Sequence, residues 1–132
     1  FRAVEQFFIR VDDLRGPALE AVGETRWLPH WGRNRISGTV ESRPDWCISR
    51  QRTWGVPLPV FYDAAGRPIL DPAVVDKVAD LVREHGTNLW FSRDDAWWAD
   101  AVGLPSGTSR RNDTLDVWID SGVSHEAVLR HR

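Results

Sequence analysis

The stretch from Asp71 to Gly86 limits the fold of this chain more than any other. Asp71 can accept backbone hydrogen bonds at the start of a helix, Pro72 suits the first helical position, and Gly86 is typical of the position after the last turn. Between them the apolar side chains recur with helical spacing and form one stripe, namely Val74, Val75, Val78, Leu81 and Val82. Such a helix is stabilised mainly by packing, so we predict that the stripe docks on a neighbouring apolar element.

The predicted partner of this helix is a β-hairpin at residues 58–70. Its two strands are Val60-Phe61-Tyr62 and Pro68-Ile69-Leu70. The sequence Asp63-Ala64-Ala65-Gly66 between them favours a four-residue turn.

The N-terminal part contains weaker patterns. Apolar side chains alternate at residues 7–11 and predict a strand that ends at the following pair of aspartates. A short helix is predicted to open at Gly16-Pro17 and to close at Gly23. Ile36 and Val40 have the spacing of one or two helical turns, and residues 46–52 read as a strand.

The C-terminal part contains three further predicted elements. Asp94 or Asp95 can cap a second short helix, and residues 103–112 have the composition of an exposed loop. A short strand is predicted at Leu115–Ile119, and Ser124 can cap a final helix. Residue patterns alone therefore support an α/β or α+β domain.

Composition excludes several classes of protein. Cys47 is the only cysteine, so neither an internal disulfide nor a cysteine-based zinc knuckle can form. The net charge of −2 gives no general attraction to nucleic acid or lipid, and no apolar run approaches the roughly 18 residues of a membrane span. We expect a cytoplasmic protein without membrane contact. Because the chain lacks methionine and begins with Phe1-Arg2-Ala3, we also expect it to be a piece of a longer protein.

Residue chemistry leaves several interpretations open. Cys47 with a histidine could form a nucleophile and base, although a cysteine between Trp46 and Ile48 fits a small buried side chain better. Asp116 and Asp120 could be paired carboxylates, but acids at a strand end more often bind neighbouring backbone amides. Neither pair of residues identifies a reaction.

Arginines and tryptophans are interleaved between residues 26 and 54. Bases stacking along a cationic groove would explain this pattern, and so would core tryptophans flanked by solvated arginines, which composition favours. The residues concerned are Arg26, Arg33, Arg35, Arg43, Arg50 and Arg52, with Trp27, Trp31, Trp46 and Trp54.

Two stretches resemble a known family. Residues 43–57 read Arg-Pro-Asp-Trp-Cys-Ile-Ser-Arg-Gln-Arg-Thr-Trp-Gly-Val-Pro, and residues 113–125 read Asp-Thr-Leu-Asp-Val-Trp-Ile-Asp-Ser-Gly-Val-Ser-His. The first resembles the signature that the isoleucine, leucine and valine enzymes among the class I aminoacyl-tRNA synthetases share after their editing insertion. The second is similar to their amino-acid pocket segment. The resemblance is colinear over the whole chain.

Details within the subfamily point to the isoleucyl-tRNA synthetases. Cys47 and Trp118 resemble that group, whereas leucine enzymes more typically have leucine and phenylalanine there, and valine enzymes more typically lack Arg52. Some relatives carry a cysteine zinc knuckle after the Val-Pro-x-Pro run. Here Asp63-Ala64-Ala65-Gly66 takes that place, so no cysteine-bound metal is expected at this position.

The resemblance implies a fold and a reaction. The chain would contribute short strands, one hairpin and two or three short helices flanking a Rossmann-type catalytic domain. Residues 1–56 would re-enter that domain after the editing insertion, residues 57–112 would form a small inserted subdomain, and residues 113–132 would form the pocket segment. The parent would be a monomer that uses ATP to activate isoleucine and transfers it to tRNA(Ile).

The resemblance also implies roles for individual residues. Trp118, Asp120 and Ser121 would bind the substrate, with Trp118 as the wall against the isoleucine side chain. Ser49, Arg50 and Gln51 would support the strand beside them. The family's His-Ile-Gly-His and Lys-Met-Ser-Lys-Ser elements, which hold ATP, lie outside this sequence. We therefore expect no catalytic residue and no amino-acid activation by the chain alone. The alternatives are the leucine or valine enzyme and a non-catalytic tRNA-binding module.

Overall fold

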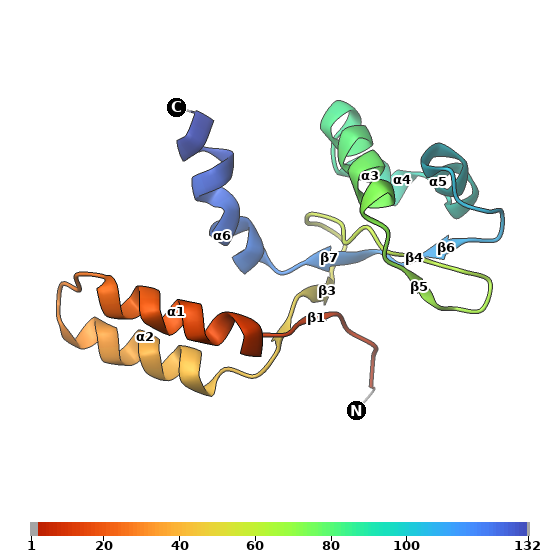
Figure 1. Cartoon of the computed structure of the whole chain (residues 1–132). Helices are drawn as coiled ribbons and strands as arrows, with labels where there is room; N and C mark the ends of the chain where they lie inside the picture. Colours follow the sequence, from red (N-terminus) through yellow and green to blue (C-terminus); the bar gives the residue numbers. More distant parts are fainter. Residues whose placement is uncertain (1–2, 132) are drawn as a thin grey trace. The chain divides into compact units, whose positions relative to one another are not determined.

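The structure is a computed structural model that describes residues 3–131, with side chains described for residues 3–130 (Figure 1). The chain divides into two compact units, and the division falls between Ile48 and Ser49. Short antiparallel strands and helices make up both units, which confirms the predicted α+β character of the chain.

The first unit consists of a strand pair and a helical hairpin. Strand β1 (Phe8–Ile9) pairs antiparallel with β2 (Trp46–Cys47). Between these strands in the sequence, helix α1 (Asp12–Glu24) and helix α2 (Trp31–Ser42) lie side by side in Figure 1 and pack on each other. The helical spacing of Ile36 and Val40 therefore correctly predicted a helix, but α2 is longer than the one or two turns predicted.

Helix α1 starts earlier than its sequence predicts. It begins at Asp12, contains Pro17, and extends past Gly23, so the predicted opening at Gly16-Pro17 is wrong. Two aspartates in the first turn favour the early start, because negative charge is stabilising at a helix N-terminus. In addition, the carboxylate of Asp45 accepts a hydrogen bond from the Val11 backbone amide at 3.2 Å.

Arg15 closes the base of the helical hairpin. Its guanidinium donates to the carbonyl oxygens of Glu41 at 3.3 Å and Arg43 at 2.8 Å, and it forms an ion pair with Asp12 at 3.0 Å. Within α1 and α2, both of which are described in full, no residue is buried. Trp31 is 64% exposed, so the interpretation of this region as core tryptophans is wrong for that residue.

The second unit begins with the strand pair on which the candidate site is built. Strand β3 (Ser49–Gln51) pairs antiparallel with β7 (Asp113–Leu115), with Arg50 opposite Thr114. On the other edge of β7, residues 56–58 add backbone hydrogen bonds of 2.8 and 2.9 Å. The predicted strand at residues 46–52 is therefore two strands, β2 and β3, with different partners.

A three-stranded antiparallel sheet forms the centre of the second unit. Strand β4 (Phe61–Tyr62) lies between β5 (Pro68–Ile69) and β6 (Ser109–Arg110). The β4–β5 pair is the predicted hairpin, and its turn is held by Asp63, whose carboxylate accepts from two backbone amides at 2.9 Å. Residues 103–112 were predicted to be an exposed loop, which is wrong at β6, because this segment completes the sheet and buries Thr108.

Three helices pack against this sheet. Helix α3 (Pro72–His85) has the limits that its sequence predicts, with Asp71 capping the first turn and Gly86 at a positive φ of 79° after the last turn. Helix α4 (Asn88–Ser92) follows, and helix α5 (Asp95–Val102) is capped by Asp94 as predicted.

The core of the second unit is aromatic. Phe61 from β4, Trp90 from α4 and Trp98 from α5 are each at most 1% exposed, and the two indole centroids lie 4.9 Å apart. Val74 and Val78 from the predicted stripe of α3 complete this cluster, and Ile69 from the hairpin packs against it. The predicted docking of the stripe near the hairpin is confirmed, except that Val75 is 40% exposed and lies outside the stripe.

Helix α6 (Val117–Ala127) and a short 3-10 turn (Leu129–His131) end the described chain. The predicted strand at Leu115–Ile119 is therefore wrong, because β7 stops at Leu115 and the chain becomes helical two residues later. Ser124 lies within α6 and does not cap it. Asp116 is the cap, and its carboxylate accepts from the Trp118 backbone amide.

Replacing Val78 by aspartate should destabilise the chain by several kcal/mol. Val78 is 3% exposed within the aromatic core, so a carboxylate there would be buried without a partner. Val75→Asp is the matched control, because Val75 lies on the same helix but is exposed, and its effect should be small. Thermal unfolding followed by circular dichroism compares the two variants. Equal melting temperatures for both would mean that the stripe is not packed.

Replacing Asp113 by asparagine should remove a pH dependence of stability. Burial raises the pKa of the Asp113 carboxyl above its ordinary value of 3.8, and the nearby Arg111 acts in the opposite direction. The folded chain thus binds this proton more tightly than the unfolded chain, and ionisation costs stability as the pH rises from 3.8 through the folded pKa.

The free energy of unfolding of Asp113→Asn, relative to that of the unsubstituted chain, should increase across that pH window and become constant above it. Chemical denaturation at stepped pH values measures this difference in the free energy of unfolding. Asp80→Asn is the control, because the Asp80 side chain is 73% exposed. A difference for Asp113→Asn that is independent of pH would contradict the prediction.

Candidate functional site

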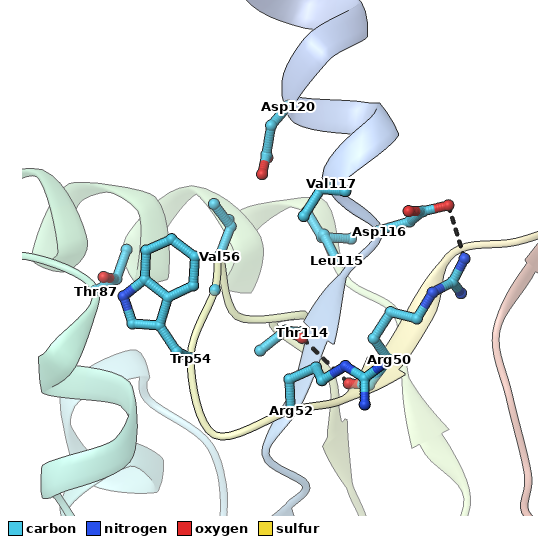
Figure 2. A pocket seen from close by; sticks show the side chains of 11 residues that line it. Arg50, Arg52, Trp54, Val56, Thr87, Thr114, Leu115, Asp116, Val117 and Asp120 are labelled. Atoms are coloured by element: carbon cyan, nitrogen blue, oxygen red, sulfur yellow. Dashed lines mark hydrogen bonds and ion pairs between the residues drawn. The ribbon is translucent and has the colours of Figure 1, made fainter.

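A pocket of about 270 Å³ lies in the second unit, where β3, β7 and the start of α6 meet the loop after β3 (Figure 2). Arg52, Trp54 and Val56 line it from that loop. Val117 and Asp120 line it from α6. These two groups are more than sixty positions apart in the sequence and are brought together by the pairing of β3 with β7.

The loop after β3 approaches β7 closely because of a glycine. Gly55 has a φ of 139°, a conformation that side chains rarely adopt, and a Cβ atom there would lie 3.1 Å from the Thr114 Cβ. Past Gly55 the chain runs along β7, where the Leu115 amide donates to the Val56 carbonyl at 2.8 Å. Only glycine lets the Trp-Gly-Val-Pro run take this path, so this residue shapes the pocket.

An ion pair lies at the junction of β7 and α6. The Arg50 Nη2 is 2.7 Å from the Asp116 Oδ2, and Asp116 is 4% exposed (Figure 2). The same carboxylate accepts from the Trp118 backbone amide through Oδ1 at 3.3 Å. The Thr114 hydroxyl donates to the Arg50 carbonyl at 3.2 Å, so Arg50 is held through both its backbone and its side chain.

The pocket walls combine apolar surface with opposite charges. Trp54 is 80% exposed and stands beside Thr87 and Val56 in Figure 2, while Asp120 reaches toward the pocket from α6. Arg52 supplies a cationic group. This combination of apolar, cationic and anionic groups is suited to the binding and positioning of a small molecule.

The structure brings together only some of the predicted site residues. Arg50 and Asp120 line the pocket, whereas Ser49 precedes Arg50 in β3, is 1% exposed and is not part of the lining. Gln51 lines a second hollow of about 410 Å³ next to the buried Asp113.

Trp118 and Ser121 lie on α6 outside the pocket, both exposed to solvent. The indole of Trp118 is presented outward, since that residue is 70% exposed. The role of these two residues in substrate binding stays a prediction.

Sequence reasoning missed several residues that line the pocket. Arg52, Trp54 and Val56 lie inside the signature stretch at residues 43–57, so the signal was present. The exposure of Trp54 contradicts its interpretation as a core tryptophan. Thr87 comes from the loop between α3 and α4, and no sequence pattern pointed to it.

The described residues contain neither a metal-binding cluster nor a helix that could span a membrane. No three histidine, cysteine, aspartate or glutamate side chains among them gather closely enough to hold a metal ion. None of the helices in the described part of the chain has both the length and the hydropathy that a bilayer crossing requires.

Comparison with known proteins gives consistent matches. The chain is similar, with 49% identity over 137 residues, to an isoleucine–tRNA ligase of Bacillus mycoides (strain KBAB4). It is also similar to those of Bacillus cereus (strain AH187) and Bacillus anthracis (strain A0248), with 49% identity over 140 residues in each. Every match covers 100% of this chain and 15% of the relative, so the chain spans about one-seventh of the length of these proteins.

The family model described as "tRNA synthetases class I (I, L, M and V)" matches residues 1–132. This match includes both stretches that form the pocket, residues 43–57 and residues 113–125. The chain therefore belongs to the class I tRNA synthetases of the isoleucine, leucine, methionine and valine group.

Proposed function

We propose that this chain is the part of an isoleucine–tRNA ligase that forms one side of the amino-acid site. One structural observation carries the proposal: the two stretches that resemble the family meet at the β3–β7 pair and together line one pocket. The identity of 49% to isoleucine–tRNA ligases over the whole chain supports isoleucine over leucine or valine as the substrate.

The proposed reaction has two steps. The carboxylate of isoleucine attacks the α-phosphorus of ATP to give isoleucyl-adenylate and pyrophosphate, and the acyl group then passes to the terminal ribose of tRNA(Ile). Such chemistry depends mainly on positioning and electrostatic stabilisation. This chain contributes pocket walls, and we assign the groups that hold ATP to other parts of the complete enzyme.

We propose that Trp118 contacts the isoleucine side chain of the substrate in the complete enzyme. The indole is large, rigid and apolar, and in this chain it is exposed at the first turn of α6 and available to a ligand. Asp120 and Ser121 follow on the same helix.

We also propose that the complete enzyme is a cytoplasmic monomer. In it, residues 1–56 would re-enter the catalytic domain, residues 57–112 would form the inserted subdomain, and residues 113–132 would form the pocket segment.

A second candidate function, a module that binds tRNA by itself, is favoured by one feature of the first unit. Trp31 is 64% exposed, and Arg26, Arg33 and Arg35 form no ion pair with any described residue. Exposed aromatic and cationic side chains are what single-stranded nucleic acid requires.

Filter binding of tRNA to the chain alone tests the second candidate. If it is correct, affinity should fall steeply with salt, because contacts to phosphates release counterions. A variant with Arg26, Arg33 and Arg35 all replaced by glutamine should then lose most of the affinity. Replacing Arg67, Arg83 and Arg130 by glutamine removes the same charge elsewhere and is the control. Absence of salt-dependent binding would leave the ligase as the only candidate.

Trp118→Ala in the complete ligase should weaken the use of isoleucine far more than the use of ATP. Loss of the indole removes apolar contact with isoleucine and enlarges the proposed amino-acid site of the complete enzyme, an effect of about 2–4 kcal/mol when scaled from truncations of buried side chains. Discrimination against valine and leucine should also fall, because a larger cavity no longer rejects by shape. Isoleucine-dependent exchange of pyrophosphate into ATP measures both constants.

Trp31→Ala serves as the control for this experiment, because Trp31 is similarly exposed but lies in the first unit. Its isoleucine and ATP constants should not change. If Trp118→Ala shifts the two constants equally, or shifts neither, Trp118 does not contact isoleucine and the assignment of the site is wrong.

A further inference from the structure

Asp116 links the strand that contains Arg50 to the helix that contains Trp118. Its Oδ2 accepts from the Arg50 Nη2 at 2.7 Å, and its Oδ1 accepts from the Trp118 backbone amide at 3.3 Å. The carboxylate is almost completely buried, with its side chain 6% exposed. A buried charge of this kind is stable only with partners, so the position of Asp116 depends on where Arg50 and the first turn of α6 lie.

Contacts within the β3–β7 pair also hold Arg50 in place, independently of Asp116. Its Nη1 donates to the Ser49 carbonyl at 2.9 Å, and its own carbonyl accepts from the Thr114 hydroxyl at 3.2 Å. Arg50 and Thr114 are also opposite each other in the β3–β7 pair. The guanidinium therefore starts from a rigid strand, and its planar fork gives the ion pair a defined direction.

Packing does little to place helix α6 in this chain. All of its residues are described and none is buried, and Trp118 is 70% exposed. Within this chain, the cap is therefore the described contact that ties the first turn of α6 to β3. Because Trp118 is the second residue of the helix, a change in the cap moves the indole directly.

We infer that Asp116, oriented by Arg50, is a positioning residue that sets where Trp118 meets the isoleucine side chain. The inference rests on the proposed function of Trp118. Neither Asp116 nor Arg50 needs to contact the substrate for this role. Through the ion pair, the rigid strand β3 fixes the direction of the first turn of α6 and therefore the position of the Trp118 indole.

Two substitutions in the complete ligase test the two members of the Asp116–Arg50 ion pair separately. Asp116→Asn keeps a good helix cap but removes the charge that pairs with Arg50. Arg50→Gln removes the other charge and keeps the strand. The matched control is Asp63→Asn, which breaks the Arg67–Asp63 pair of 2.8 Å in the same unit, at the β4–β5 turn and not among the residues that line the pocket.

The expected result is a selective loss of isoleucine use. Asp116→Asn and Arg50→Gln should each raise the KM for isoleucine about tenfold, or about 1.4 kcal/mol, while the KM for ATP changes less than about twofold. Discrimination of isoleucine from valine should fall in parallel. The double variant should be no worse than the worse single variant, because both changes break one interaction. Asp63→Asn should change none of these constants.

Three results would overturn the inference while leaving the proposed function in place. If the effects of the two single variants add, each residue acts independently, as it would by contacting substrate. If the constants for isoleucine and ATP change together while the melting temperature falls, the pair stabilises the fold only. If neither constant changes while Trp118→Ala still raises the KM for isoleucine, Trp118 is placed by something else. A Trp118→Ala variant with unchanged constants would instead refute the proposed site, and this inference with it.

Discussion

Strand β7 makes contacts on both of its edges, and the candidate site depends on them. On one edge it pairs with β3, and on the other it bonds to residues 56–58. Its own residues Asp113 and Thr114 are buried, so the three segments form one continuous layer. Because about sixty residues separate β3 from β7, this pairing costs considerable chain entropy and forms only if those residues fold compactly between them.

The aromatic core of the second unit supplies that compactness. Trp90 and Trp98 have no exposed surface, and Phe61 packs edge-on against Trp90 with centroids 5.5 Å apart. Arg110 lies over the Trp90 ring at 4.9 Å and pairs with Asp95 at 3.3 Å. Burial of this much apolar surface is the main stabilising contribution, and it holds β4 and β6 together so that the chain returns to β3 at β7.

The parts of the chain that carry exposed aromatic side chains have a different character. Helices α1, α2 and α6 contain no buried residue, although all their residues are described. Their local geometry depends on caps and hydrogen bonds, such as those of Arg15 at the base of the first hairpin and Asp116 at the start of α6.

The sequence by itself determined the elements whose signals are local. Asp71, Pro72 and Gly86 set the limits of α3, and the turn at Asp63 set the hairpin, because caps and turns are satisfied by residues a few positions away. The signature stretches also identified the family, and two of the six predicted site residues, Arg50 and Asp120, line the pocket. Sequence did not determine the change from strand to helix after Leu115, since the alternation of Leu115, Val117 and Ile119 fits a strand equally well. Tertiary structure decided that the chain becomes helical here. The Asp116 carboxylate pairs with Arg50, 66 positions away, and caps the first turn of α6, and a local sequence pattern cannot indicate a partner at that distance.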